Sequence, residues 1–405
     1  MERSWSPPSP TTTSASAAFD RRRLTVAYFL TFVGLGLTTA SMGPTLSAMA
    51  AHTQSGLGQA SWLFTARWLG YLMGSLLGGR LYDRLRGHPV MAGALLLMAA
   101  ALALAPGISQ LRVLAGVLLV LGIAEGTLDV GGNTLLVWVH GRQVGPYMNG
   151  LHFTFGVGAL LSPLIIAQLL QAEHDFSWPY WVIALLLLPI ALWVARLPSP
   201  TMGGQVEQTP GVTRPNYVLL GLFVLFFFIC EGTAAGFPGW VSSYAQELGL
   251  ADATAAAYLT SGYWGAFTVG RLLGIPISAR VRPRYILLAD LLGGLLALSL
   301  IVCWPRSLEA VWTGSVLLGL ALASQFPTGI ILAERRMVIT GQVTSMFFVG
   351  ASVGNMLFPL LFGQLFEAYG PPAIMQAMAV ELLVALLVLL ALVRATHPSV
   401  PAAQS

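Results

Sequence analysis

Apolar stretches of about 20 residues recur along this chain from Leu24 to Arg394, separated only by short polar breaks. A helix of that length crosses roughly 30 Å of hydrocarbon, which is the thickness of a bilayer core. Hydrophobic residues make up 56% of the 405 residues and charged residues 9%, too few charges to keep a globular surface in water. The sequence therefore predicts an all-α protein embedded in a lipid bilayer.

The hydropathy pattern predicts twelve transmembrane helices, six on each side of a polar break. We place them at about 24–50, 59–80, 89–107, 110–139, 147–171, 178–197, 216–246, 255–279, 285–304, 308–333, 340–367 and 371–394. The expected domains are a disordered cytoplasmic tail (1–23), an N-terminal six-helix bundle (24–197), a cytoplasmic linker (198–215), a C-terminal six-helix bundle (216–394) and a second cytoplasmic tail (395–405). The first apolar stretch is too long for the core of a signal peptide, so we expect no cleavage.

The arginines predict the orientation, because basic residues gather in cytoplasmic loops. The chain has 20 Lys and Arg residues, all of them arginine, and most fall in alternate loops, beginning with Arg21, Arg22 and Arg23. Only Arg112 and Arg306 fall in loops on the opposite side. Both termini are therefore expected in the cytoplasm.

An internal repeat relates the two groups of six helices. A shift of about 196 positions aligns Gly158 with Gly354, and the segment 162–168 with the related segment 358–364. Two pseudo-symmetric bundles of this kind are typical of transporters that hold a substrate near the bilayer midplane between them. The repeat thus predicts a substrate path between the two halves.

Ionisable side chains inside predicted helices are candidate functional groups, because each costs roughly 2.5–3.5 kcal/mol at membrane depth. Glu125, Asp129 and Asn133 are spaced by four, so they share one helix face. Two carboxylates about 6 Å apart resist joint ionisation, which predicts a shared proton or cation and makes Asp129 a candidate for Na⁺. Pairing of this face with Arg67 is the structural alternative. Glu231, near the middle of the seventh helix, is a third candidate ion-coupling residue.

Neutral polar and aromatic side chains inside the helices are candidate substrate ligands. Sugar hydroxyls require neutral donors and acceptors, while the C–H faces of a sugar stack on aromatic rings. Aromatic residues also mark membrane interfaces, and a histidine near a helix end is commonly just a hydrogen-bonded polar group. Arg271 is expected to be a structural ion-pair partner. The candidate substrate-binding residues are Asn133, Asn149, His152, Tyr263, Trp264, Gln325 and Asn355.

Several protein classes are excluded by what the sequence lacks. No polybasic cluster with interleaved aromatic residues appears, so despite the net charge of +4 we expect no nucleic acid as a partner. Cys230 and Cys303 are too far apart for a metal motif, and we expect no cofactor beyond a coupling Na⁺ or H⁺. No nucleophile–base pair, phosphate loop or metal spacing is present, so an enzyme is not expected.

The loop after the second helix carries a recognisable motif. Its sequence, Gly79-Arg80-Leu81-Tyr82-Asp83-Arg84-Leu85-Arg86-Gly87, is similar to the Gly-x-Leu-x-Asp-Arg-x-Gly signature of the major facilitator superfamily, with Arg86 in place of the second glycine. Together with the repeat and the helix count, the chain resembles that superfamily over its whole ordered length. The resemblance implies the major facilitator fold, a monomer, and a gating role for Asp83 and Arg84, which latch helix ends together. Arg67 is added to these as a structural or gating residue.

The fourth and fifth helices resemble one branch of the superfamily more closely. The runs 126–133 and 152–163 are similar to the sodium-dependent glucose transporters, which are related to the bacterial fucose and glucose symporters. The resemblance implies that Asp129 and Asn133 belong to an ion-and-sugar site, with Glu125 close by. The Gly-Pro-x-x-Gly-Gly pattern of drug antiporters is absent after Ser162-Pro163.

The sequence as a whole predicts a secondary active transporter of a bacterial inner membrane. The expected activity is symport of a monosaccharide such as glucose with Na⁺ or H⁺, by alternating access of one site to the two sides of the membrane. A proton-coupled exporter of drugs or amphipaths is the main alternative. A non-transporting sensor on the same scaffold is another, which would bind sugar without accumulating it.

Overall fold

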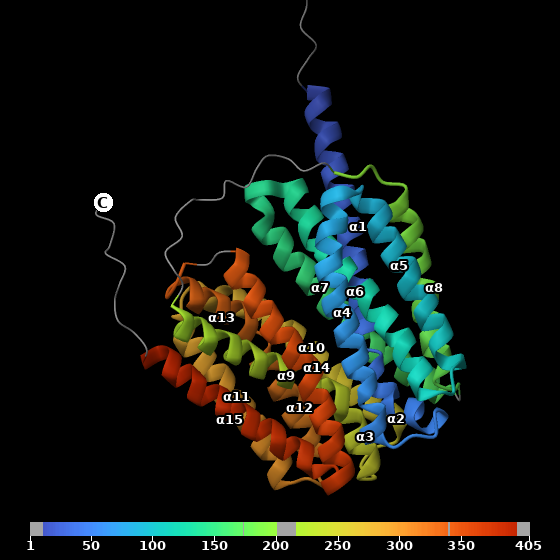
Figure 1. The fold of residues 1–405 in the computed structure, drawn as a ribbon, viewed down its shortest axis with the longest axis vertical. Helices are drawn as coiled ribbons and strands as arrows, with labels where there is room; N and C mark the ends of the chain where they lie inside the picture. Colours follow the sequence, from blue (N-terminus) through green and yellow to red (C-terminus); the bar gives the residue numbers. More distant parts are fainter. Residues whose placement is uncertain (1–10, 173, 201–215, 339–340, 395–405) are drawn as a thin grey trace, which may run out of the picture.

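The computed structural model describes residues 11–172, 174–200, 216–338 and 341–394, which form helices joined by short turns, with no strand among them (Figure 1). The helices are α1 (Thr11–Thr39), α2 (Met42–His52), α3 (Leu57–Ala60), α4 (Trp62–Arg84), α5 (Gly87–Leu104), η1 (Ala105–Gly107), α6 (Leu111–His140), η2 (Gly141–Gln143), α7 (Val144–Gln171), α8 (Ser177–Ala195), α9 (Tyr217–Glu247), α10 (Ala253–Ser278), α11 (Pro283–Cys303), α12 (Leu308–Leu322), α13 (Gln325–Glu334), α14 (Gly341–Tyr369) and α15 (Pro372–Arg394).

The helices confirm the predicted all-α membrane fold. Within the described residues, nine spans are long and apolar enough to cross a membrane, and the bent pair α1–α2 makes a tenth. The helices α4 and α10 are more polar, but their 23 and 26 residues also exceed the length that a bilayer core requires. These two complete the twelve spans expected from the sequence.

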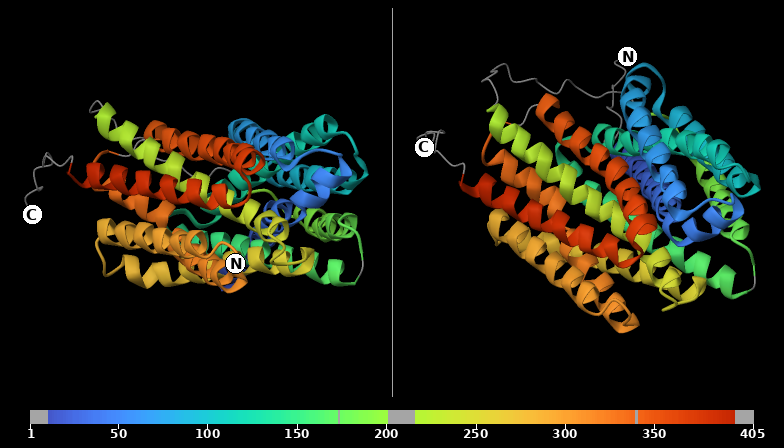
Figure 2. Two further views of the ribbon diagram at one scale, coloured as in Figure 1. Left: turned by 90° about the horizontal axis from the view of Figure 1, so that it is seen from below. Right: turned by 60° about the horizontal axis from the view of Figure 1, so that its bottom comes forward.

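The chain forms two bundles that lie side by side. Helices α1–α8, blue to green in Figure 1, form one, and α9–α15, yellow to red, form the other; both remain separate groups in the views of Figure 2. The predicted linker 198–215 and C-terminal tail 395–405 lie almost entirely outside the described residues. The predicted disordered tail 1–23 was wrong in part, because α1 already begins at Thr11. Extending a nucleated helix adds one hydrogen bond for each residue fixed, and this segment contains several alanines, which favour helix.

Two predicted helices are broken in the structure. The first span is divided between α1 and α2, which meet at 42°, and the tenth is divided between α12 and α13. A proline follows each break, Pro44 after the first and Pro327 after the second. Because proline has no N–H, neither residue can donate to the carbonyl four positions earlier, at Ala40 or Ala323. At the first break, the carbonyl groups of Thr38 and Thr39 also accept hydrogen bonds from Arg67 and become part of the site described below.

Close backbone contacts fix the position of α6 against α4. A Cβ atom on Gly122 would overlap the carbonyl oxygen of Arg67, and one on Gly126 would overlap that of Tyr71. Glycine is therefore needed on this face of α6 so that the two helices can approach. The approach places side chains of α4 directly against the polar face of α6.

The internal repeat is visible in the packing. Gly158 on α7 lies against the carbonyl oxygen of Val33 on α1. Gly354 on α14, its counterpart in the repeat, lies in the same way against the carbonyl oxygen of Phe228 on α9. In each half the first helix and the fifth thus approach through an equivalent glycine.

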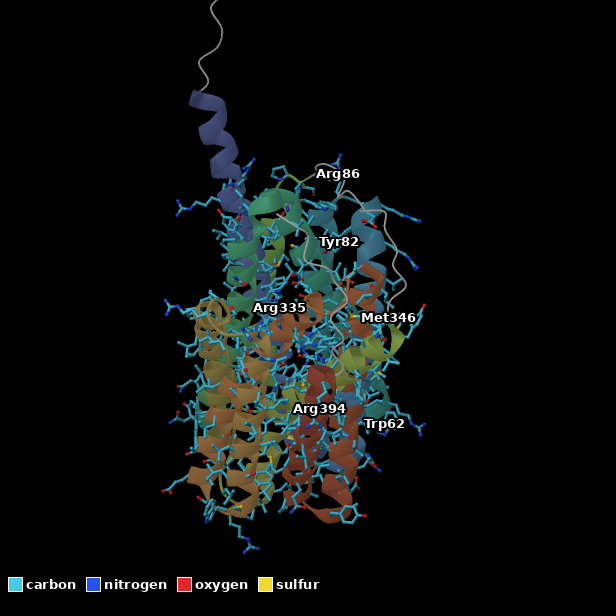
Figure 3. All side chains as sticks on the ribbon, turned by 90° about the vertical axis from the view of Figure 1, so that its left-hand side faces the viewer. Trp62, Tyr82, Arg86, Arg335, Met346 and Arg394 are labelled. Carbon is cyan, nitrogen blue, oxygen red and sulfur yellow. The ribbon has the colours of Figure 1, made fainter. Side chains whose placement is uncertain are left out.

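The two halves are joined toward one end of the molecule, which we call the Trp62 end; the opposite end, where α4 leads into α5, is the Arg86 end (Figure 3). Hydrogen bonds across the halves near the Trp62 end include Ser47 to Ser243 (3.0 Å), the Gln364 amide to the Gly58 carbonyl (2.8 Å), and Thr65 to the Met356 carbonyl (3.1 Å). Farther along α7, the Ser261 hydroxyl donates to the Leu160 carbonyl at 2.8 Å. These contacts close the molecule at the Trp62 end.

Candidate functional site

A cavity of about 270 Å³ lies between the two halves. Its walls come from α1, α4, α6 and α7 on one side and from α9, α10, α13 and α14 on the other. At its floor, toward the Trp62 end, Gly43 packs directly on the backbone of Pro238. Its polar and aromatic lining consists of Phe32, Thr39, Phe64, Arg67, Trp68, Tyr71, Glu125, Asp129, His152, Phe155, Glu231, Trp264, Phe267, Arg271, Phe326, Phe348, Ser352 and Asn355.

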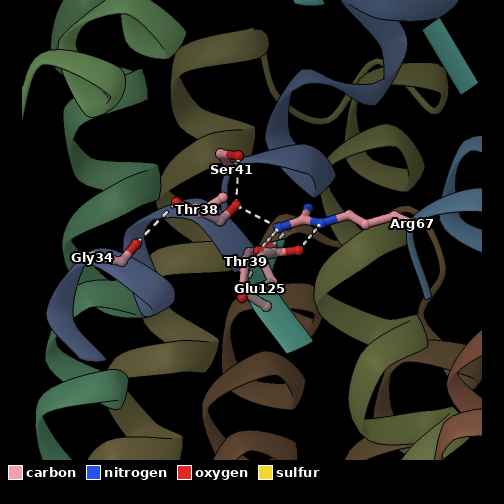
Figure 4. A network of polar contacts seen from close by, with 6 residues as sticks. All are labelled: Gly34, Thr38, Thr39, Ser41, Arg67 and Glu125. Atoms are coloured by element: carbon pink, nitrogen blue, oxygen red, sulfur yellow. Dashed lines mark hydrogen bonds and ion pairs between the residues drawn. The ribbon is translucent and has the colours of Figure 1, made fainter. Parts of the chain in front are cut away.

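Arg67 and Glu125 form a buried ion pair on the wall contributed by the N-terminal half (Figure 4). Arg67 Nε donates to Glu125 Oε2 at 2.8 Å, and Arg67 Nη2 donates to Glu125 Oε1 at 2.5 Å. The guanidinium also donates to the carbonyls of Thr38 (2.8 Å) and Thr39 (3.4 Å), and the Thr39 hydroxyl donates to Glu125 Oε1 (3.2 Å). Both charges are therefore neutralised and hydrogen-bonded, as buried charges in proteins need to be.

This ion pair changes the interpretation of the acidic face of α6. The spacing predicted that Glu125 and Asp129 would share a proton or a cation, but the Glu125 carboxylate is already balanced by Arg67. The structural alternative, pairing with Arg67, accounts for Glu125. The expected shared pair is corrected to one neutralised carboxylate and one separate carboxylate.

Asp129 lies one turn along α6 from Glu125 and borders the cavity without a positive partner in the described part of the chain. Its Oδ2 accepts a hydrogen bond from the Tyr71 hydroxyl at 2.5 Å, and its Oδ1 accepts one from the Asn133 amide at 3.1 Å. Asn133 itself is not part of the cavity lining, so it orients Asp129 instead of contacting a ligand. Asp129 is thus held in a fixed position by two neutral donors, with its charge uncompensated.

The C-terminal half contributes charges of both signs to the opposite wall. Glu231 on α9 lines the cavity, and the guanidinium of Arg271 on α10 attracts it electrostatically. Arg271 forms no ion pair with a described residue; it lies over the Phe267 ring at 4.7 Å from the centroid, and its Nε is buried without a partner. The ion pair expected for Arg271 is absent among the described residues, and the residue lines the cavity instead.

Trp264 and Asn355 also line the cavity, and each carries a hydrogen-bonding atom that has no partner. The indole Nε1 of Trp264 and the Oδ1 of Asn355 are both buried without a partner. Trp264 packs edge-on to Phe155 with ring centroids 6.1 Å apart, and His152 packs edge-on to Phe32 at 5.9 Å. The C-terminal wall therefore contains an unpaired indole donor and an unpaired amide oxygen.

Other predicted ligands do not reach the cavity. Asn149 is exposed in the second turn of α7, and Gln325 is buried at the start of α13 outside the lining. Tyr263 is fully buried behind Trp264, where its hydroxyl donates to the Ala234 carbonyl at 3.1 Å. That carbonyl is free because Pro238 cannot donate to it. Helical period places residues on a face, but it does not say which face a neighbouring helix covers.

Asp83 and Arg84, the residues of the family-like latch, are exposed at the end of α4. Among the described residues neither forms an ion pair or a side-chain hydrogen bond. They lie at the Arg86 end, where the two halves are apart in this structure. A latching contact there stays a prediction for another conformation.

Sequence reasoning missed Tyr71 and Trp68 on α4 as lining residues. Tyr71 lies four residues after Arg67, on the same face of α4. Because α4 packs against the acidic face of α6, a residue one turn from Arg67 meets a residue one turn from Glu125. The signal was therefore available in the spacing once Arg67 and Glu125 were considered as a pair.

The fold and the cavity between two six-helix halves define a polytopic membrane protein of the transporter type. The sequence matches the Major Facilitator Superfamily over residues 24–337 and 244–405. The chain therefore belongs to that superfamily, as its motif and repeat had predicted.

This chain is also similar to individual proteins of known sequence or structure. The chain is 30% identical over 379 residues to sodium-dependent glucose transporter 1 of Danio rerio, covering 84% of this chain and 64% of that protein, so it spans less than two thirds of the relative's length. It is 27% identical to the protein of the same name from Homo sapiens, over 84% of this chain and 72% of that one. Among solved structures, the nucleoside transporter NupG (D323A mutant) superposes with a TM-score of 0.77 at 13% identity, over 92% of this chain and 99% of that chain.

Proposed function

We propose that this protein is a secondary active transporter that carries a monosaccharide such as glucose into the cell together with a Na⁺ or a proton. The observation that supports it best is the juxtaposition of Asp129 with neutral polar and aromatic groups of the opposite half in one closed-ended cavity. The names of the relatives, which are sodium-dependent glucose transporters, point in the same direction.

Asp129 is the proposed coupling residue. It is the carboxylate of the N-terminal wall that has no counter-charge, and two neutral donors hold it in place. A carboxylate at membrane depth in this setting gains from binding a small cation, because its charge is otherwise uncompensated. Na⁺ would bind the carboxylate oxygens directly, whereas a proton would convert Asp129 into a neutral acid. Glu125 supports the site through its ion pair with Arg67, and Glu231 is the second candidate on the other wall.

The remaining lining suits a small neutral polyol. The cavity of about 270 Å³ lies near the lower limit of ligand pockets, roughly 300 Å³, which favours a compact substrate over a drug-sized one. The Trp264 indole and the Asn355 amide oxygen provide one donor and one acceptor, each buried and unused. Trp68 and Phe155 add aromatic faces for the C–H surface of a sugar ring.

Coupling follows if ion and sugar favour the same conformation. The structure is closed at the Trp62 end, and the positive loops at the Arg86 end place that end in the cytoplasm, so we assign an inward-facing state in a plasma membrane. A ligand shifts this equilibrium only by its difference in affinity for the two states. Because the cavity walls belong to different halves, rocking one half against the other changes the distance between Asp129 and the sugar ligands.

The test is uptake of radiolabelled glucose into proteoliposomes that contain the purified protein. Three conditions are compared: an inward Na⁺ gradient, an inward proton gradient, and neither. We expect accumulation with one of the gradients, and its loss in Asp129→Asn, which keeps the shape of the side chain and removes its charge. Asn149→Ala is the matched control, because Asn149 is exposed outside the cavity.

Each outcome is informative. The gradient that drives accumulation identifies the ion. Binding of glucose without accumulation under any gradient would favour a sensor. No glucose binding, together with gradient-dependent extrusion of an amphipathic cation, would replace the sugar symporter with an exporter.

A further inference from the structure

A second buried carboxyl group lies in the C-terminal half, outside the cavity lining. Glu381 is in the middle of α15, its residue is 5% exposed, and both of its carboxylate oxygens are buried without a hydrogen-bond partner. A buried carboxylate with neither a counter-charge nor a hydrogen bond is among the costliest arrangements in a protein. Its neutral acid form removes most of that cost.

No described residue donates a hydrogen bond to Glu381 or forms an ion pair with it. Its Oε1 lies against α9 at Gly232, where an added Cβ atom would be 2.7 Å away. The aromatic ring of Phe358 packs at the same glycine. The Thr233 hydroxyl is close enough to act on the carboxyl, yet neither group reaches hydrogen-bond geometry with the other.

Three carboxyl groups of the C-terminal half act electrostatically on the buried Cys230 thiol. They are Glu231 on α9, Asp290 on α11 and Glu381, and we call them the acidic cluster. Asp290 accepts a hydrogen bond from Ser324, and Glu231 is attracted by Arg271. Glu381 is the carboxyl group of this cluster that has neither kind of support.

We propose that Glu381 is a proton-binding site of the C-terminal half, distinct from the Asp129 site, and that its proton exchanges with water. Its Oε1 lies against Gly232, the residue that follows the cavity-lining Glu231 on α9. A metal cation fits less well. Glu381 and Thr233 supply three oxygens, and the one carbonyl freed nearby by Pro238, that of Ala234, already accepts from Tyr263.

Infrared spectroscopy of the purified protein tests this directly, without any transport assay. A protonated carboxyl group has a C=O stretching band that carboxylates and amides lack. We expect the spectrum of the wild-type protein to contain such a band, and Glu381→Gln to lose it. Transfer into D₂O should shift the band to lower frequency, because the acid proton exchanges. The exposed carboxyl Glu309 provides the matched control, since Glu309→Gln should leave the band unchanged.

Two further measurements keep the test decisive. Thr233→Val removes a hydroxyl that does not hydrogen-bond to the carboxyl, so the band should persist at nearly the same frequency. Glu381→Gln should fold and keep the thermal stability of the wild type, because an amide has the size of the neutral acid. The proposal is overturned if no band is lost in Glu381→Gln, if the band does not respond to D₂O, or if Na⁺ removes the band at constant pH. Failure of Glu381→Gln to fold would also count against a neutral acid.

Discussion

The two walls of the cavity differ in how completely their charged side chains are paired. In the N-terminal half, Arg67 and Glu125 neutralise each other and use backbone carbonyls and a hydroxyl to complete their hydrogen bonds. On the C-terminal wall, Arg271, Trp264 and Asn355 each bury a polar atom without a partner. The charged groups of the first wall are thus paired before any ligand binds. The second wall still has polar atoms that are unpaired and available for binding. This difference suggests that the N-terminal wall fixes the position of Asp129 while the C-terminal wall responds to what is bound.

The largest expected effect comes from breaking the assembled pair. Arg67→Met leaves Glu125 charged and buried, which should cost about 3–5 kcal/mol of stability. Thermal unfolding of the purified protein in detergent measures this as a fall in the midpoint temperature. Replacing both partners, with Arg67→Met and Glu125→Leu together, should restore much of the loss because no uncompensated charge remains. If the double variant is as unstable as the single one, the pair is not the source of the effect.

The same substitution on the other wall should behave differently. Arg271→Met removes a side chain that has no ion-pair partner in the described chain, so the folded state loses its contact with Phe267 and its electrostatic attraction to Glu231. We expect a destabilisation of about 2 kcal/mol, the size of a desolvated cation–π contact and smaller than the loss in Arg67→Met. Comparing the unfolding midpoints of Arg67→Met and Arg271→Met in one detergent measures the asymmetry directly. Equal losses would mean that the two walls are equally preassembled.

Tyr71→Phe sharpens the role given to Asp129. The variant removes the hydroxyl that donates to Asp129 Oδ2 and leaves the ring in place. A hydrogen bond to a charged group contributes about 1.5–3 kcal/mol, so the dependence of uptake on ion concentration should shift by roughly 10- to 150-fold. The maximal rate at saturating ion should change less. Asn133→Ala, which removes the other donor, should act in the same direction, and a pair of variants without effect would show that Asp129 does not bind the ion.

The closed end offers a prediction about conformation. A Cβ atom on Gly58 would overlap the carboxylate of Glu367, and the Gly58 carbonyl accepts from Gln364. Gly58→Ala should therefore weaken closure of the Trp62 end by about one hydrogen bond, ~1 kcal/mol, or about fivefold in population. Spin labels at the exposed positions 62 and 369 would report a longer distance, after replacement of the exposed Cys303.

A second variant separates this cause from a general disturbance of α3. Glu367→Ala removes the group that the new methyl would meet. In that background, Gly58→Ala should no longer change the distance between the labels. A persistent change would mean that the effect does not arise at this contact.

The sequence predicted the architecture because the lipid bilayer constrains every spanning helix of the chain. Hydropathy, the repeat and the arginine pattern all reflect that constraint. It located Asp129, Glu231, Trp264 and Asn355, which do border the cavity, through their polarity at membrane depth. The structure places Asn149 and Gln325 outside the cavity, because which face of a helix its neighbours cover depends on packing between distant segments. Glu381 was visible as a charge within an apolar helix, yet only the structure shows that its oxygens lack partners.

The smallest expected effect distinguishes lining residues from their supports. Tyr263 is buried behind Trp264 and bonds a backbone carbonyl, so Tyr263→Phe should cost about 1 kcal/mol in stability and leave glucose affinity nearly unchanged. Trp264→Phe keeps an aromatic ring in the cavity and removes the unused indole donor, so affinity should fall by about fivefold with little loss of stability. Equilibrium binding and thermal unfolding, measured on both variants, give four values. The reverse pattern would move the substrate contact from Trp264 to Tyr263 and mean that the binding surface extends behind the cavity wall.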